Sequence, residues 1–275
     1  MVVKDHAISQ ESFSISKCSA CNFLFTNPRP NKENIGQYYE SANYISHQDS
    51  STNLTNIIYK IVRNITLKQK VTWINGLSKK KGKLLDFGCG TGYFLKSAEK
   101  DGWEVVGVEP DPTASSIAKS KQKIKVYNNI DALGGEKKFD IITLFHVLEH
   151  VHDLQTTLEI LLSKLKQRGS LLIAVPNHDS LDAKRYREHW AALDVPRHLY
   201  HFTFETMERL AGEYNLRIKA TKPMTFDSYY VSLLSEGYMN NRNKIINSLK
   251  IGYKSNKLAK EDNNYSSLLF ILKKT

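Results

Sequence analysis

Over residues 54–65 and again over 71–77, apolar side chains recur at intervals of three or four residues, with lysines between them. They are Leu54, Ile58, Ile61, Ile65, Val71, Ile74 and Leu77. Side chains at these intervals return to one face of an α-helix, so the pattern predicts an amphipathic helix. The run SKKKGK at 78–83 is polar and contains glycine, and it should end the helix.

Beyond this break, short apolar runs alternate with amphipathic segments. The runs are 83–88, 104–109, 124–127, 139–145 and 170–176, and helices are expected to start near Tyr93, Pro112 and Asp153. This alternation is typical of a parallel sheet with helical crossovers. After a capped helix at 203–214, two last strands are expected at 216–221 and 266–274. The sequence therefore predicts an α/β, Rossmann-like fold with a seven-stranded, mostly parallel sheet flanked by helices.

The first 40 residues or so lack such a pattern. We expect an irregular segment over 1–45, because Pro28 and Pro30 oppose regular structure, followed by a helical cap over 46–80. Together these parts would form an N-terminal helical extension. The main domain should occupy 81–275, with insertions at about 177–202 and 227–262.

Length and composition narrow the class of protein. A chain of 275 residues with 41% hydrophobic and 24% charged residues suits one principal domain with appendages. It contains no apolar run approaching the ~18 residues of a membrane span, and its start lacks the pattern of a signal peptide. Three cysteines are too few for a disulfide framework, so we expect a cytoplasmic protein.

The formal net charge of +11 is unevenly distributed. Residues 50–85 contain eight lysines or arginines and no acid, and residues 237–260 contain six more, again without an acid. Such surfaces could attract nucleic acid, anionic lipid or a phosphorylated substrate, or could simply be solvated. No nucleic-acid recognition motif accompanies the charge, so we do not expect nucleic acid as a partner.

The stretch LLDFGCGTGYF, residues 84–94, carries the most specific chemistry. Asp86 ends a predicted strand, and Gly88, Gly90 and Gly92 alternate before a predicted helix. Glycines allow a sharp turn and let a ligand approach the backbone. Tyr93 stands where a dinucleotide fingerprint has its third glycine. An acid before the loop would repel a pyrophosphate, but it suits a ligand that carries an ammonium and a sulfonium.

These residues resemble the class I S-adenosylmethionine-dependent methyltransferases, and the match extends in order over about 80–220. The resemblance implies S-adenosylmethionine as cofactor and S-adenosylhomocysteine as product. It also implies that Glu109 binds the ribose hydroxyls and that 128–133 surrounds the adenine. The cofactor-binding residues that we expect on this basis are Asp86, Gly88, Cys89, Gly90, Gly92, Tyr93, Glu109, Pro110, Asn129, Ile130, Asp131, Phe145 and His146. Cys89 is expected to be a packing residue rather than a nucleophile.

The layout is also similar to a bacterial subgroup of small-molecule methyltransferases with an N-terminal cysteine knuckle. VPNHDS at 175–180, Trp190 and DVPRHLYHFT at 194–203 carry this resemblance. The knuckle is incomplete, because only Cys18 and Cys21 are present and His6 alone could add a third ligand. A structural zinc site needs four ligands, so we expect an unmetallated remnant.

Methyl transfer is an in-line displacement, and an oxygen or carbon acceptor must also lose a proton to a base. The base should lie beyond the carboxyl ends of the strands. Our catalytic candidates are His150, Asp194, His198 and His201. For His198 a structural anchor is an equal alternative to a base. Arg197 either clamps an acidic group of the substrate or pairs with Asp194.

The segment FHVLEHVHD, 145–153, raises the question of a metal. Related O-methyltransferases carry E-x-x-E-H here and a later histidine, and those side chains hold a divalent ion. The corresponding set would be His146, Glu149, His150 and His201. Because a histidine replaces the first acid, and similar sequences occur in metal-free methyltransferases, we expect no metal. Asp153 should be a helix N-cap.

We therefore predict an enzyme that methylates oxygen or carbon of a small, acidic or sugar-related acceptor. Base amino groups are not expected, because FHVL stands where a [DNS]-P-P-[YFW] motif would follow strand four. The alternatives are an RNA methyltransferase that uses the basic 50–85 face, and an inactive cofactor-binding protein. Tyr38, Tyr39 and Tyr44 could form a lid or simply pack.

Overall fold

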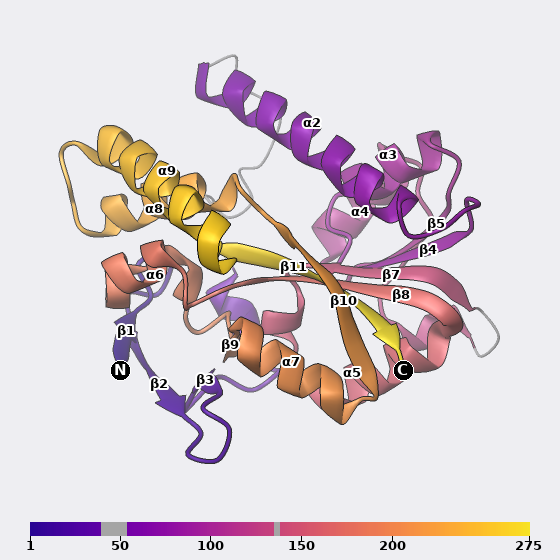
Figure 1. Cartoon of the computed structure of the whole chain (residues 1–275), viewed down its shortest axis with the longest axis horizontal. Coiled ribbons are helices and arrows are strands. Elements are labelled where there is room, and N and C mark those ends of the chain that lie inside the picture. The colour runs from indigo at the N-terminus through magenta and orange to yellow at the C-terminus, as the bar shows by residue number, and fades with distance from the viewer. Residues whose placement is uncertain (40–53, 135–137) are drawn as a thin grey trace.

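The structure is a computed structural model that describes residues 1–39, 54–134 and 138–275, with side chains in the first helix described from residue 60 onward. Its centre is a seven-stranded sheet (Figure 1). The strands are β4 (Lys83–Phe87), β5 (Glu104–Val108), β6 (Val126–Tyr127), β7 (Phe139–Phe145), β8 (Leu165–Pro176), β10 (Leu216–Pro223) and β11 (Ser267–Lys274).

The strand order is β10-β11-β8-β7-β4-β5-β6, and β11 alone runs antiparallel to its neighbours. The predicted mostly parallel sheet of seven strands is thus confirmed. Chain order reverses at β4, which lies between β5 and β7. In open α/β sheets a ligand binds beyond the strand ends at such a switch point. The glycine-containing loop follows β4.

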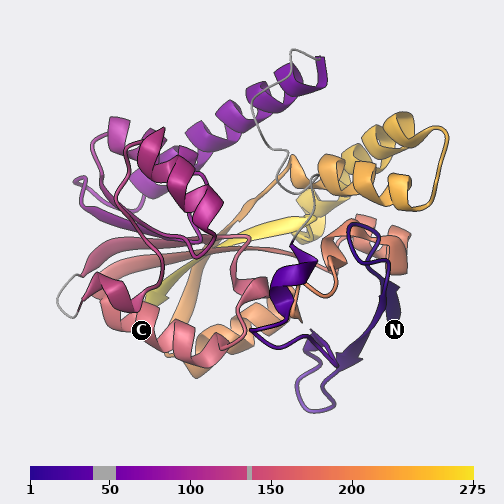
Figure 2. The ribbon, with the colours of Figure 1, turned by 180° about the vertical axis from the view of Figure 1, so that it is seen from behind.

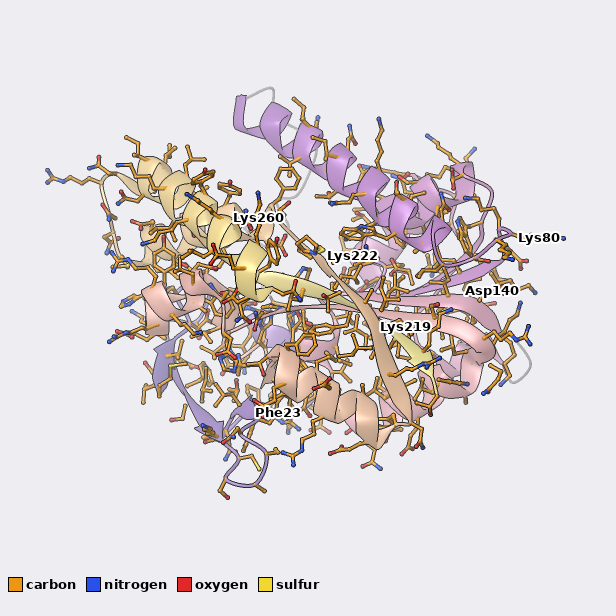
Figure 3. The ribbon with its side chains drawn as sticks, viewed as in Figure 1. Phe23, Lys80, Asp140, Lys219, Lys222 and Lys260 are labelled. Carbon is orange, nitrogen blue, oxygen red and sulfur yellow. The ribbon has the colours of Figure 1, made fainter. Side chains whose placement is uncertain are left out.

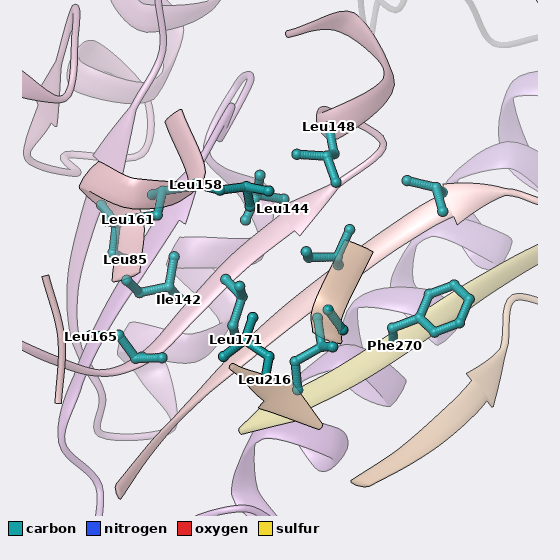
Figure 4. Close-up of a cluster of buried hydrophobic side chains, with 14 of the residues drawn as sticks. Leu85, Ile142, Leu144, Leu148, Leu158, Leu161, Leu165, Leu171, Leu216 and Phe270 are labelled. Atoms are coloured by element: carbon teal, nitrogen blue, oxygen red, sulfur yellow. The ribbon is translucent and has the colours of Figure 1, made fainter. Parts of the chain in front are cut away.

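Helices cover both faces of the sheet (Figures 1 and 2). One face carries α2 (Leu54–Asn75), α3 (Tyr93–Lys100) and α4 (Pro112–Ser120), and the other carries α5 (Leu154–Lys164) and α7 (Phe204–Glu213). Leu84 and Ile141 pack toward the first face, while Leu85 and Ile142 pack toward the second (Figure 4). Burial on both faces explains why these strands appear in the sequence as continuous apolar runs.

Two predicted helix starts behave differently. Thr203 caps α7 as expected, with its side chain accepting a hydrogen bond from the Thr206 N–H. Asp153 occupies the N-cap position of α5 but makes no side-chain cap. Its carboxylate instead pairs with Lys32 of the N-terminal region.

The N-terminal region is where the prediction of an irregular start and a helical extension is wrong. It forms β1 (Val2–Lys4), β2 (Ser12–Lys17) and β3 (Leu24–Thr26), which join β9 (Tyr200–His201) in a four-stranded antiparallel sheet. Phe23, in the turn before β3, stacks on Tyr200 and packs beside Phe202 near α7 (Figure 3). The prolines do not prevent these strands, because β3 ends before Pro28. A 3₁₀ turn, η1 (Ile35–Tyr38), follows.

The two insertions pack together beside the main sheet. The first contains α6 (Leu181–Tyr186) and the 3₁₀ turns η4 (Arg187–His189) and η5 (Ala191–Leu193); the second is the helix pair α8 (Asp227–Tyr238) and α9 (Lys244–Asp262). Two more 3₁₀ turns, η2 (Asp131–Leu133) and η3 (Leu148–His150), follow β6 and β7. Among the described residues, no helix is both long enough and apolar enough to span a membrane.

Candidate active site

The loop between β4 and α3 is shaped by its glycines, which have φ values of +74° at Gly88 and +53° at Gly90. A Cβ on Gly88 would lie 2.4 Å from Cγ2 of Val147, so no larger residue fits there. A Cβ on Gly90 would meet nothing within 4 Å. The backbone at Gly90 therefore borders open space that a ligand can approach.

Glu109, just after β5, has its carboxylate fixed by this loop. Oε2 accepts a hydrogen bond of 2.7 Å from the Gly90 N–H, and Oε1 accepts one of 2.9 Å from the Asp111 N–H. Burial raises the pKa of Glu109, and the two backbone donors oppose this shift. Each carboxylate oxygen still has a free lone pair, so the group can accept two more hydrogen bonds from a ligand.

Asp86, at the end of β4, is buried at 4% exposure. Its Oδ1 accepts a 2.6 Å hydrogen bond from Thr143 Oγ1 of β7. Burial raises the pKa of Asp86 to about 7, although Thr143 and Lys70 act in the opposite direction. The carboxyl group therefore holds its proton more tightly than an exposed aspartate does, and a cationic ligand would stabilise its charged form.

Lys70 of α2 is a candidate site residue that the sequence patterns did not indicate. Its Nζ lies 3.8 Å from the ring centroid of Phe145. Burial lowers the pKa of Lys70, while Asp86 and Asp227 raise it. A small cleft beside it is lined by residues of α2 and of the segment leading into α8. The one sign of this role in the sequence was that Lys70 lies on the same face of the predicted helix as the apolar Ile74.

His146 follows Phe145 and has a left-handed backbone, with φ of +57°. Its Nε2 lies 3.1 Å from Oδ2 of Asp227, and its Nδ1 lies 3.4 Å from Oε1 of Glu149. Burial alone would lower the pKa of His146, but the two carboxylates outweigh it and raise the pKa to about 10. His146 is thus an imidazolium held between two acids, one of them from the second insertion.

A second group of polar residues lies next to this pair. One ligand atom each of Glu149, His150 and His198 lies within 4.8 Å of the others. The Nδ1 atoms of His150 and His198 are 3.0 Å and 2.8 Å from the carbonyl oxygens of Arg197 and Ala192. A carbonyl only accepts, so both Nδ1 atoms carry a proton. The Nε2 of His198 lies 3.9 Å from Oδ2 of Asp194.

Comparison with known proteins identifies the fold family. A family model described as "Methyltransferase domain" matches residues 63–221, more than half of the chain. The chain belongs to the class I S-adenosylmethionine-dependent methyltransferase family. The glycine loop, Asp86 and Glu109 all lie within the matched range.

Curated relatives resemble this methyltransferase over part of their length. A ubiquinone biosynthesis O-methyltransferase of Pelagibacter ubique is 33% identical over 101 residues, covering 34% of this chain and 42% of the relative. An uncharacterized methyltransferase of Alkaliphilus oremlandii is 32% identical over 111 residues, covering 39% of this chain and 51% of the relative. The chain therefore spans about half or less of the length of these relatives.

Among solved structures, a magnesium protoporphyrin IX methyltransferase from Synechocystis with bound S-adenosylhomocysteine covers 89% of this chain and all of that one. Its TM-score is 0.59 and its sequence identity 14%, so the likeness concerns the fold. A plantazolicin methyltransferase, also bound to S-adenosylhomocysteine, gives 0.51 at 17% identity and covers 78% of this chain and 84% of that one.

In the methyltransferase, the remaining predicted cofactor residues lie at or near the carboxyl edge of the parallel strands. Cys89 is a packing residue, since a Cβ on Gly107 would lie 2.5 Å from its Sγ. Asn129 uses its Oδ1 to cap the turn after β6, accepting from the Ala132 N–H. Three other predicted cofactor residues differ in exposure: Ile130 is buried, while Pro110 and Asp131 are exposed. Tyr93 begins α3, and Arg63 of α2 lies over its ring.

Two of the catalytic candidates have contacts that suit a structural role. His201 is buried in β9, and its Nε2 lies 3.2 Å from Thr26 Oγ1 of β3. Asp194 accepts two hydrogen bonds from Arg197. Of the two alternatives for Arg197, the structure favours pairing, because the buried guanidinium also binds Asp5 and the Tyr38 carbonyl.

The described part of the chain brings together one set of three residues able to hold a metal ion, and it differs from the set considered from the sequence. His198 joins Glu149 and His150, whereas His146 pairs with Asp227 and His201 with Thr26. Glu149 is fully buried, and neither of its carboxylate oxygens has a hydrogen-bond partner. The His146 imidazolium, with Nδ1 3.4 Å from Oε1, places one positive charge beside this buried carboxylate. The His150 and His198 imidazoles are nitrogen ligands of the kind that a divalent ion binds.

The other N-terminal candidates also have defined positions. His6 stacks on Tyr238 at 4.6 Å between ring centroids, so it does not join the cysteines. Cys18 and Cys21 lie in the turn between β2 and β3, where the backbone N–H groups of Cys21 and Ala20 lower the pKa of Cys18. Tyr39 Oη lies 3.0 Å from His150 Nδ1, and Tyr38 donates to Glu11. Tyr44 lies outside the described residues.

Proposed function

We propose that this methyltransferase transfers the methyl group of S-adenosylmethionine to an oxygen atom of a small acceptor. The observation that carries the cofactor part is the Glu109 carboxylate, which two backbone donors hold with lone pairs free for two hydroxyls. The oxygen acceptor is supported by the curated relatives named O-methyltransferases, which match about a third of the chain.

Three charged residues would hold the cofactor. Glu109 would accept hydrogen bonds from both ribose hydroxyls. Asp86 would bind the ammonium of the methionine part, which favours its ionised form. Lys70 would bind the methionine carboxylate, since it lies close enough to Asp86 for their charges to interact. Phe145, beneath the lysine, would supply an apolar surface.

The Glu149, His150 and His198 cluster would serve the acceptor. In the displacement, the acceptor oxygen forms a bond to the methyl carbon as the carbon–sulfur bond breaks, and the electron pair returns to sulfur. In the metal-free protein the hydroxyl proton would pass to Nε2 of His150 or of His198. Burial, with His198 nearby, lowers the pKa of His150 to about 4, so this imidazole is uncharged at neutral pH and a weaker base than an ordinary histidine.

The same three side chains would be the ligands if a divalent ion binds. When bound, such an ion lowers the pKa of a coordinated hydroxyl and so favours the oxyanion. In either case His146 is a positioning residue, because its imidazolium contacts Glu149 and neutralises part of the buried charge.

The test is transfer of a radiolabelled methyl group from S-adenosylmethionine to a panel of catechols, phenols, hydroxy acids and sugar acids, with tRNA and rRNA in parallel. We expect labelled methyl ethers or esters from a small acceptor. His198→Ala should reduce turnover roughly 100-fold without changing cofactor affinity. Lys79→Ala, an exposed control in the loop after α2, should leave both turnover and cofactor affinity unchanged. Label in RNA alone, or on carbon alone, would contradict the proposed acceptor.

A further inference from the structure

Helix α9 places its small residues inward and its large apolar residues outward. Ser248, Gly252, Ser255 and Ala259 are buried, whereas Ile245, Ile246, Leu249 and Tyr253 are 63%, 55%, 56% and 61% exposed. Residues 245, 249 and 253 are four apart, so they lie along one side of the helix. A surface helix of a globular protein normally has the opposite arrangement.

The contacts of α9 with its neighbours fix this orientation. A Cβ on Gly252 would lie 2.5 Å from Cδ1 of Tyr229 in α8, so the two helices approach too closely for a larger side chain. Ser255 Oγ donates 2.7 Å to the buried carboxylate of Asp182, and Asn256 Nδ2 donates 2.8 Å to the Thr225 carbonyl. Turning the helix to bury its apolar stripe would break these bonds and produce a clash.

The charged residues of α9 that border its apolar stripe (Ile245, Ile246, Leu249 and Tyr253) are all positive, except for the last two residues of the helix. Five exposed lysines lie on α9: Lys244, Lys250, Lys254, Lys257 and Lys260. Figure 3 shows Lys260 near the end of the helix. The acids Glu261 and Asp262 follow only at its C-terminus. Apolar side chains bordered by lysines complement a surface that is anionic outside and apolar beneath.

We propose that α9 docks this protein onto an anionic membrane surface. The helix would lie in the plane of the interface, with Ile245, Ile246, Leu249 and Tyr253 among the acyl chains and the lysines at lipid phosphates. A second copy of the chain is a poorer occupant, because two facing α9 helices would bring lysines against lysines. Nucleic acid would use the lysines but leave the apolar stripe in water.

Helix α2 provides a second contact of the same character. Ile61 and Ile65, four residues apart, are 54% and 47% exposed within the basic region 50–85. Both views of the ribbon show the α8–α9 pair and α2 along the upper edge of the molecule, with the first turns of α2 toward the pair and its other end beside α3 (Figures 1 and 2). Peripheral docking of this kind needs no membrane-spanning helix. The proposal does not depend on methyl transfer, so it is tested by measuring membrane binding rather than turnover.

The experiment is co-flotation of the full chain with phosphatidylcholine vesicles that contain or lack phosphatidylglycerol. We expect binding to the anionic vesicles that weakens with salt. Ile246→Gln with Leu249→Gln should weaken it roughly 10-fold or more, and each of Lys250→Gln and Lys254→Gln roughly 5-fold. The matched control is Val2→Gln, an equally exposed apolar residue on β1 at 64%, which should bind like the wild type.

All of these side chains are exposed, so the melting temperatures should agree and a loss of binding would not reflect unfolding. The proposal is overturned if the wild type does not float with anionic vesicles, or if the Ile246→Gln, Leu249→Gln variant floats as well as the Val2→Gln control. It is equally overturned if this double substitution abolishes a dimer seen by light scattering, since the stripe would then be a contact between copies.

Discussion

Arg197 and Asp5, 192 residues apart in the chain, form a buried ion pair with 3.0 Å between Nη2 and Oδ1. The guanidinium also binds Asp194 and the Tyr38 carbonyl. Burial alone would raise the pKa of Asp5, but Arg197 and the Ser9 N–H and hydroxyl hold it below its ordinary value. This pair attaches the N-terminal sheet to the loop that carries His198, one of the three residues of the proposed acceptor site.

Replacing Asp5 should therefore destabilise the protein strongly. Asp5→Ala leaves the Arg197 charge buried with one acidic partner fewer, and we expect a loss of about 3 kcal/mol in the free energy of unfolding. Because the folded pKa of Asp5 is lowered, its contribution is present above the unfolded pKa of about 3.9 and disappears as the pH falls through the folded value.

Urea unfolding at neutral pH measures this loss. Asp179→Ala is the control, because Asp179 forms an exposed ion pair with Lys184 and should contribute less than about 1 kcal/mol. Equal stability of the two variants would show that the buried pair does not hold the N-terminal sheet in place.

The affinity for S-adenosylhomocysteine should depend on pH through Asp86. The pKa of Asp86 is about 7 without ligand, and the cofactor's ammonium should lower it on binding. Affinity should then approach its full value as the pH rises above 7, and fall by up to about tenfold per pH unit below it. His146, with a pKa of about 10, and His150, at about 4, do not titrate in this window.

Calorimetric titrations from about pH 5.5 to about pH 7.5, below the ordinary pKa of an α-amino group, provide the measurement. Asp86→Asn should bind weakly and almost independently of pH. A wild-type affinity that stays constant over this range would assign the ammonium to another residue.

Lys70 should discriminate between ligands with and without the methionine part. Lys70→Met keeps a long apolar side chain over Phe145 but removes the charge, so affinity for S-adenosylhomocysteine should fall roughly 10-fold. Affinity for 5′-methylthioadenosine, which has no carboxylate, should stay the same. The exposed Lys68 on the same helix provides a control as Lys68→Met. Equal losses for both ligands would mean that Lys70 supports the pocket only through packing.

Metal analysis tests the proposed ligand set of Glu149, His150 and His198. Protein purified without chelators should contain up to one divalent ion per chain, and Glu149→Gln should lose it. His201→Gln should retain the ion, because His201 contacts Thr26 rather than the cluster. Wild-type protein that stays metal-free after incubation with Zn²⁺, Mn²⁺ or Co²⁺ would leave only proton transfer as the function of these histidines.

The central sheet and the cofactor loop could be predicted from the sequence because their signals are local. Strands buried on both faces appear as uninterrupted apolar runs, and β7 begins and ends where the pattern of 139–145 predicts. The loop after β4 requires glycine at Gly88, where Val147 leaves no room for a side chain. Chemistry of this kind is visible in a few consecutive residues.

The features that the sequence did not predict depend on distant contacts. The strands before Pro28 are short, and β3 finds its partner in β9, so the alternation in SFSISK at 12–17 was too weak a signal by itself. His198 lies beside Glu149 because the loop after η5 folds back onto η3, where the Leu199 N–H donates to the Glu149 carbonyl. The role of Lys70 likewise depends on how α2 packs against β7.

The most direct test of the methyl-donor site is the affinity of S-adenosylhomocysteine for the wild type and for Glu109→Ala, measured by isothermal titration calorimetry. Glu109 should make two charge-assisted hydrogen bonds to the ribose, so its removal should weaken binding roughly 100-fold or more. The predicted result is that the wild type binds S-adenosylhomocysteine and that Glu109→Ala loses affinity to this degree. Absence of binding by the wild type, or equal affinity of the two proteins, would contradict it.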